Sequence, residues 1–146
     1  MEEAWSFSYS ISCATSPEFA WKFWTNVANW TLDADVVAVS LDGPFRQGAR
    51  GVTESRSSGR IEWVVAELEG MSAVLEFPAP GATGRFAWTF APEGSQRVRM
   101  TQRASLAGPQ ALSYVESFGR GLEAGLPDGM KKLRDAIECA ASKSAG

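Results

Sequence analysis

The chain has 146 residues, of which 45% are hydrophobic and 21% charged, and its formal net charge is −3. This length predicts a single domain, which we place at residues 1–142 with a frayed tail at 143–146. The acidic balance argues against nucleic-acid binding, because nucleic-acid-binding proteins are usually basic. The chain lacks an apolar run of about 18 residues and begins with acidic residues, so it predicts neither stable membrane insertion nor a secretory leader.

The residue types also narrow the chemistry. The chain contains no histidine, which removes the commonest general base and metal ligand, so we expect no metal ion and no cofactor. Cys13 and Cys139 make no disulfide framework, and we expect reduced thiols in a cytoplasmic protein; a single bridge between them is the alternative. Six tryptophans and eight phenylalanines are a large aromatic supply for one small domain.

The first regular pattern is WSFSYSIS at residues 5–12, where aromatic or aliphatic residues alternate with serines. Only a β-strand separates such a series onto two faces, because successive side chains point in opposite directions. We predict a strand over about residues 4–13 with its aromatic side chains toward the core. Its serines should face water, because burying four hydroxyls without partners would be costly.

A short helix and a series of strands follow. In TSPEFAWKFW, Ser16 or Thr15 can cap a helix whose first position suits Pro17, and a second helical turn is expected at Val27–Trp30. The strands predicted after it are joined by short links, several of which contain glycine, and this favours an antiparallel meander. Their expected ranges are 36–42, 49–56, 60–68, 71–79, 84–91 and 95–104.

The end of the chain changes to helical spacing of its apolar residues, over 112–122 and again over 126–140. Four glycines and Pro127 within residues 119–129 predict a kink or break there, and a hinge. An antiparallel sheet needs cover for its apolar face. We therefore predict an α+β fold: a curved seven-stranded sheet around a long C-terminal helix, with two short helices after the first strand.

Three stretches, TSPEFAWKFWTNVANW, DADVVAVSLDGPFRQGARG and LAGPQALSYV, resemble START-like, polyketide cyclase/dehydratase-type proteins. These belong to the helix-grip (SRPBCC) superfamily, which also includes the birch-pollen-allergen type. The resemblance spans nearly the whole chain, although Asn26 stands where members often have Asp. It implies an apolar cavity between sheet and helix. Members carry lipids, bind hormones or aromatic metabolites, shape polyketides or assist chaperones, so the resemblance leaves the activity open.

Small residues on the face of two neighbouring strands predict where that cavity lies. A three-residue turn pairs Arg56 with Arg60 and places Thr53 opposite Trp63, so Gly51 and Thr53 face inward and leave space. A packed core with a slipped register is the alternative, because a one-residue shift reverses every face. The predicted ligand-binding residues are Gly51, Thr53, Trp63, Phe77, Trp88, Phe90, Met100, Gln102, Tyr114 and Phe118.

Three functions fit these residues. We expect a non-enzymatic binder or carrier of a small apolar, ring-containing molecule, acting as a monomer or loose homodimer. The second is a cyclase or dehydratase in which an inward-facing Glu67 of raised pKa, or another polar group of the pocket, handles protons. The other proton-handling candidates are Thr53, Gln102 and Tyr114. The third is a chaperone-assisting adaptor, which the Ser/Arg alternation of the outer sheet face argues against.

Overall fold

The computed structural model of the chain describes residues 3–32, 35–56 and 59–145. Within these ranges the elements, in chain order, are β1 (Glu3–Cys13), α1 (Pro17–Thr25), η1 (Val27–Leu32), β2 (Val36–Leu41), β3 (Arg50–Ser55), β4 (Gly59–Glu69), β5 (Ser72–Ala79), β6 (Ala82–Pro92), β7 (Val98–Ala107), η2 (Ala111–Tyr114), η3 (Val115–Gly119) and α2 (Arg120–Ala145).

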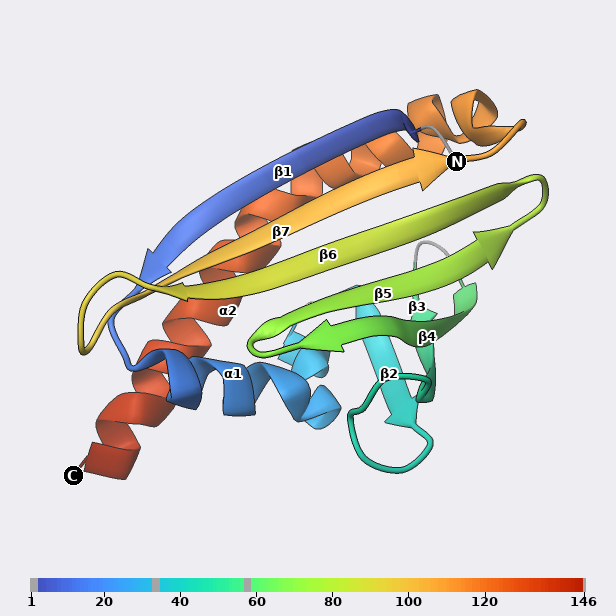
Figure 1. Ribbon diagram of the computed structural model, residues 1–146. Helices are drawn as coiled ribbons and strands as arrows, with labels where there is room; N and C mark the ends of the chain where they lie inside the picture. The colour runs from blue at the N-terminus through green and yellow to red at the C-terminus, as the bar shows by residue number, and fades with distance from the viewer. Residues whose placement is uncertain (1–2, 33–34, 57–58, 146) are drawn as a thin grey trace.

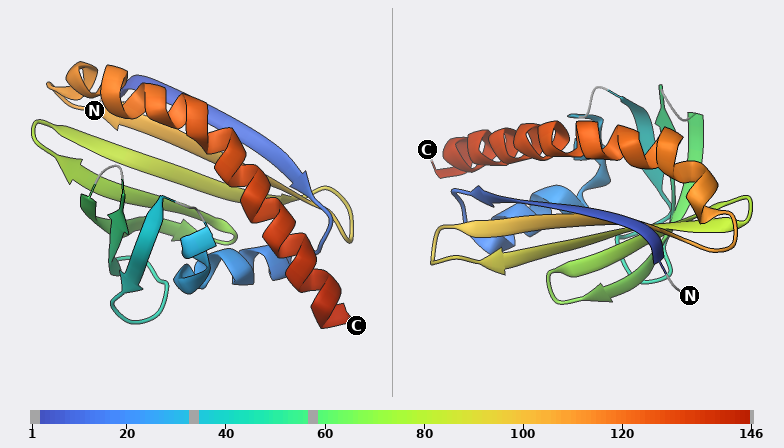
Figure 2. Two further views of the ribbon diagram at one scale, coloured as in Figure 1. Left: turned by 180° about the vertical axis from the view of Figure 1, so that it is seen from behind. Right: turned by 90° about the horizontal axis from the view of Figure 1, so that it is seen from above.

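The strands form one antiparallel sheet in the order β1-β7-β6-β5-β4-β3-β2. In Figure 1, β1, β7, β6 and β5 run almost side by side, whereas β2 and β3 stand at a steep angle to them. The pairing of β4 with β5 ends at Val64–Glu76, so the residues of β4 before Val64 are paired with β3 alone. The sheet bends at this point, and α2 crosses its concave face (Figure 2). The predicted α+β architecture is confirmed.

The alternation of β1 separates its two faces as predicted. Ser6, Ser8 and Ser10 are exposed on the outer face, whereas Ile11 is buried on the inner one. The serine hydroxyls find polar partners outside: Ser10 shares a hydrogen bond of 2.8 Å with Thr101 on β7. The first helix also begins as predicted, because the Ser16 hydroxyl caps α1.

The long helix differs from the expectation. The break predicted within residues 119–129 lies earlier, in the 3₁₀ turn η2 and the π-helical turn η3, and α2 is continuous through Pro127. Leu126 and Met130, on either side of Pro127, are both buried in the core. Their packing holds the segment helical despite its weak intrinsic propensity. The helix also extends to Ala145, into the residues assigned to a tail.

One strand register and one strand range differ from the predicted ones. Gly51 pairs with Trp63, and Glu54 rather than Arg56 pairs with Arg60; the turn residues 57–58 lie outside the described ranges. A shift of two residues keeps the same side chains on the inner face, so the predicted faces hold. Strand β7 is displaced along the chain from the predicted 95–104 to Val98–Ala107. None of the helices in the described ranges has the length and apolar character needed to cross a bilayer.

Candidate ligand-binding site

The concave face of the sheet is lined by alternate residues of the strands, which point toward α1, η1 and α2. In the described part of the chain, the strand residues on this face are uncharged. Their aromatic side chains fall into groups that differ in how much of their surface stays open. That difference decides which predicted residues can meet a ligand.

The group around Trp63 corrects the expectation of open space at Gly51. A Cβ on Gly51 would lie 2.2 Å from Cζ2 of Trp63, so the indole already occupies that space. The indole N–H donates to the Thr53 hydroxyl at 3.0 Å, and the ring lies 5.1 Å from that of Trp30, centroid to centroid. On the concave side, Gly51 and Thr53 therefore support the Trp63 ring, which fills the space predicted to be open.

The group around Trp88 is packed core. The ring of Trp88 lies 4.9 Å from that of Trp24 on α1 and stacks at 6.1 Å with Phe90. Met100, on the neighbouring strand, is completely buried. Trp88 and Phe90 pack against α1, and these two residues and Met100, all predicted to bind ligand, offer almost no surface to one.

The group around Phe77 is partly open. The Phe77 ring is buried over Gly84, stacks at 5.4 Å with Phe86 and meets Phe118 of η3 at 5.4 Å. Phe86 and Phe118 are only half-buried, although both contact the core. This end of the concave face retains apolar surface that a ligand can contact.

Gln102 is a polar residue on the inner face of β7, and it is half-buried. Its neighbours on the same face of β7, Met100 and Ala104, are 0% and 1% exposed. The Gln102 amide has no protein partner in the described part of the chain, where no fully buried polar side-chain atom lacks a hydrogen bond. The amide must therefore reach solvent from between two buried residues, which requires open space beside it.

The sequence reasoning missed the residues on β1 that lie next to Gln102. Tyr9 pairs with Gln102, and Phe7 pairs with Ala104, which pairs in turn with Phe86. Tyr9 and Phe7 are half-buried and face inward. We call Phe7, Tyr9, Phe86 and Gln102 the concave patch. The alternation in β1 identified the inward face of Tyr9, but only the β1–β7 register places it beside Gln102.

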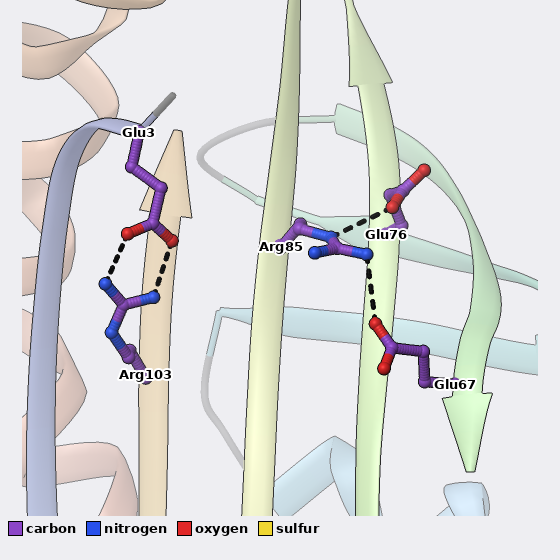
Figure 3. Close-up of polar contacts among 5 residues, drawn as sticks. All are labelled: Glu3, Glu67, Glu76, Arg85 and Arg103. Carbon is purple, nitrogen blue, oxygen red and sulfur yellow. Dashed lines mark hydrogen bonds and ion pairs between the residues drawn. The ribbon is translucent and has the colours of Figure 1, made fainter. Parts of the chain in front are cut away.

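The other proton-handling candidates lie elsewhere. A bulge between Val65 and Glu67 turns Glu67 to the outer face, where its carboxylate contacts Arg85 at 3.2 Å; Arg85 also binds Glu76 at 3.0 Å (Figure 3). The cyclase alternative that used an inward-facing Glu67 therefore loses that residue. Tyr114 donates its hydroxyl to the carbonyl of Pro80 at 2.8 Å, at the turn between β5 and β6. The structure thus does not bring Glu67, Tyr114, Thr53 and Gln102 together.

Charged groups of α2 reach the sheet at both ends of the concave patch. Near one end, the Trp5 indole donates to Glu123 at 2.9 Å, and this hydrogen bond holds the pKa of Glu123 below its usual value. Near the other, Glu138 accepts from the backbone N–H of Ala14 at 2.8 Å. Beside it, burial raises the pKa of the Cys13 thiol to about 12. Cys13 and Cys139 are both free. The described residues gather no group of three metal-ligating side chains.

Two surface hollows lie outside the concave patch. A groove of about 410 Å³ lies where the start of β4 separates from the end of β5, and Gly51, Trp63, Val64, Glu76 and Pro78 are among the residues that line it. A second hollow, of about 460 Å³, lies between the start of α1 and the end of α2. Two predicted site residues, Gly51 and Trp63, therefore line the groove at the start of β4 and not the concave patch.

Comparisons with known structures agree with this architecture. Norcoclaurine synthase from Thalictrum flavum, in complex with dopamine and hydroxybenzaldehyde, has a TM-score of 0.68 at 9% identity, over 91% of this chain and 86% of that one. The KanY protein has a TM-score of 0.73 at 13% identity, and the match covers 94% of this chain and 99% of that one. The di-domain ARO/CYC StfQ of the steffimycin biosynthetic pathway has a TM-score of 0.72 at 13% identity, and the match covers 97% of this chain and 52% of that one. No curated protein matched in sequence.

A curved antiparallel sheet crossed by a long C-terminal helix, shared with these structures, defines the helix-grip fold. The family model described as "Polyketide cyclase / dehydrase and lipid transport" matches residues 4–138. The chain belongs to this family, and the resemblance found in its sequence is confirmed.

Proposed function

We propose that this protein binds a small apolar, ring-containing molecule between α2 and the concave patch. The observation that carries the proposal is the Gln102 amide, which reaches solvent between the buried residues Met100 and Ala104. The half-buried rings of Phe7, Tyr9 and Phe86 supply apolar surface around it. Family membership supports a ligand-binding or cyclase-type activity, and the norcoclaurine synthase structure holds ring-containing molecules.

The expected affinity follows from the area that a ring can bury. An aromatic group the size of an indole buries about 200 Å². At about 25 cal/mol per Å² this contributes about 5 kcal/mol, from which the cost of association is subtracted. A contribution of about 5 kcal/mol corresponds to a dissociation constant of roughly 0.2 mM, so we expect two-ring compounds to bind with dissociation constants of about 0.2 mM or weaker.

The test is a titration with N-phenyl-1-naphthylamine, a neutral probe whose emission rises in apolar surroundings. The parent protein should bind it saturably, and Phe86→Ala, which removes a ring of the concave patch, should weaken binding by about tenfold or more. Phe19→Ala removes an equally half-buried ring from α1, beside the second hollow, and should leave binding unchanged. Phe7→Leu provides a milder change in the patch should Phe86→Ala fold poorly.

The proposal is overturned by either of two results. One is that the folded parent does not bind the probe up to the probe's solubility limit. The other is that Phe86→Ala and Phe7→Leu both bind it as tightly as the parent.

A further inference from the structure

The concave patch contains two polar groups that the protein itself leaves without a partner. Tyr9 on β1 and Gln102 on β7 are directly paired across the strands. Directly opposite side chains have Cβ atoms roughly 5 Å apart, so one small molecule can touch both. Neither the hydroxyl nor the amide makes a hydrogen bond within the described ranges. Thr53, the other polar side chain discussed for this face, already accepts from Trp63.

This arrangement lowers the affinity for a purely hydrocarbon ligand. A ligand lying over Tyr9 and Gln102 removes water from both groups, and a buried donor or acceptor left unpaired lowers affinity by about tenfold. An oxygen on the ligand can pair with both, because a hydroxyl and an amide each donate and accept. The patch should therefore bind a ring that bears a hydroxyl or a carbonyl more tightly than a ring without one.

The same face disfavours a charged ligand. Its strand residues carry no charge in the described part of the chain, and an unpaired ion is costly to bury. Two carboxylates of α2 that contact β1 or the residue after it already have partners. Glu123 accepts from Trp5 and from Arg120, and Glu138 accepts from the backbone N–H of Ala14 at 2.8 Å. Arg134 pairs with Asp135 at 2.9 Å.

We propose that Tyr9 and Gln102 are the specificity-determining pair of this protein, selecting a neutral ring compound that bears a hydroxyl or carbonyl oxygen. This inference rests on the proposed function, because it assumes that the ligand lies on the concave patch. Tyr9 and Gln102 position the ligand through its oxygen, while the neighbouring rings of Phe7 and Phe86 bury its apolar part.

The experiment compares three probes of nearly equal size by titration calorimetry: naphthalene, naphthol and naphthoate. The parent should bind naphthol about tenfold more tightly than naphthalene and bind naphthoate most weakly. Tyr9→Phe and Gln102→Met should each reduce the preference for naphthol over naphthalene by about fivefold. Both variants should bind naphthalene at least as tightly as the parent does, a gain that mere damage to the fold would not produce.

Matched controls remove the same groups elsewhere. Tyr114→Phe removes a hydroxyl that is bonded to Pro80, and Gln96→Met changes an exposed glutamine before β7; neither should alter the preference. If the parent binds none of the three probes, the proposed function fails and this inference with it. If the parent binds naphthalene as tightly as naphthol, or if both patch variants keep the preference, only the specificity assignment is overturned.

Discussion

At the scale of single residues, two glycines of the sheet are covered by aromatic rings. A Cβ on Gly51 would lie 2.2 Å from Trp63, and one on Gly84 would lie 2.0 Å from Phe77. Both rings are themselves buried, so they cannot swing out into water without losing their packing. The absence of a side chain at these positions is thus a requirement of the core.

We predict that Gly51→Ala and Gly84→Ala each destabilise the fold by about 1–3 kcal/mol, because the added methyl overpacks the core. Gly121→Ala is the control: it lies in α2 with nothing within 4 Å of its added Cβ, and it should stabilise the protein by up to about 1 kcal/mol. Urea unfolding of the three variants measures these changes. A Gly51→Ala variant as stable as the parent would show that Trp63 does not rest on this glycine.

The two thiols should differ sharply in reactivity. Cys13 is fully buried, and burial raises its pKa to about 12, whereas Cys139 is exposed on α2. Because the thiolate is the reactive form, a disulfide reagent at pH 8 should modify Cys139 quickly and Cys13 only on unfolding. Cys139→Ser should remove the fast phase, and a fast phase that survives in this variant would contradict the burial of Cys13.

The raised pKa of Cys13 also predicts a loss of stability at alkaline pH. The buried thiol stays neutral while the unfolded thiol ionises, so its contribution is complete below the ordinary pKa of 9.0 and lost progressively as pH rises toward about 12. Unfolding of the parent and of Cys13→Ala, followed between pH 8 and 11, should show the steeper decline in the parent. Equal slopes would refute this linkage.

At the scale of elements, the start of α2 is the weakest part of the helix that covers the sheet. The π-helical turn η3 precedes it, and Pro127 supplies no N–H for the carbonyl four residues earlier. The indole of Trp5 packs against Gly119 and holds Glu123 by a hydrogen bond. This hydrogen bond and the packing of the indole tie the weak segment to β1.

We predict that amide hydrogens of residues 115–129 exchange faster than those of residues 131–143, measured by mass spectrometry. Each glycine in the earlier segment weakens the helix by roughly 1 kcal/mol relative to alanine. Trp5→Phe, which keeps an aromatic ring but removes the indole N–H, should accelerate exchange in the first segment and leave the second unchanged. Uniformly slow exchange across both segments would refute a hinge here.

At the scale of the whole molecule, hydrogen bonds between distant parts of the chain lower the pKa of three glutamates in the described ranges. Arg103 donates to Glu3, Ser12 to Glu93 and Trp5 to Glu123, and these hydrogen bonds lower the pKa of each carboxyl from 4.5. The Glu3–Arg103 pair joins the two strands at one edge of the sheet (Figure 3). The folded state therefore binds protons less readily than the unfolded chain does.

The stability that these carboxylates contribute should be present above about pH 4.5 and lost as pH falls below it. Urea unfolding at pH 7, 4.5 and 3 measures this loss. Trp5→Phe removes the donor to Glu123 and keeps its carboxylate, so it should make the decline between pH 4.5 and 3 shallower than in the parent. An acid decline that is unchanged in this variant would show that the Trp5–Glu123 bond is not part of it.

Much of this molecule could be predicted from local patterns. The alternation of β1 and the Ser16 cap of α1 each depend on residues adjacent in the chain, and both are present in the structure. The candidate site was less predictable, because its open surface depends on how side chains of different strands fill space. The sequence predicts open space above Gly51, yet the ring of Trp63 fills that space.

What the sequence determined by itself is the α+β class and most of the strand faces, since hydrophobic period and turn residues act over a few positions. The resemblance of three stretches of the sequence indicated the family, which the match over residues 4–138 confirms. The tertiary structure alone decided the site. A bulge after Val65 turned Glu67 outward, and the pairing of β1 with β7 brought Tyr9 beside Gln102, 93 positions away in the numbering (102 − 9). Pairing between distant strands is set by the packing of the whole sheet, and no local pattern contains it.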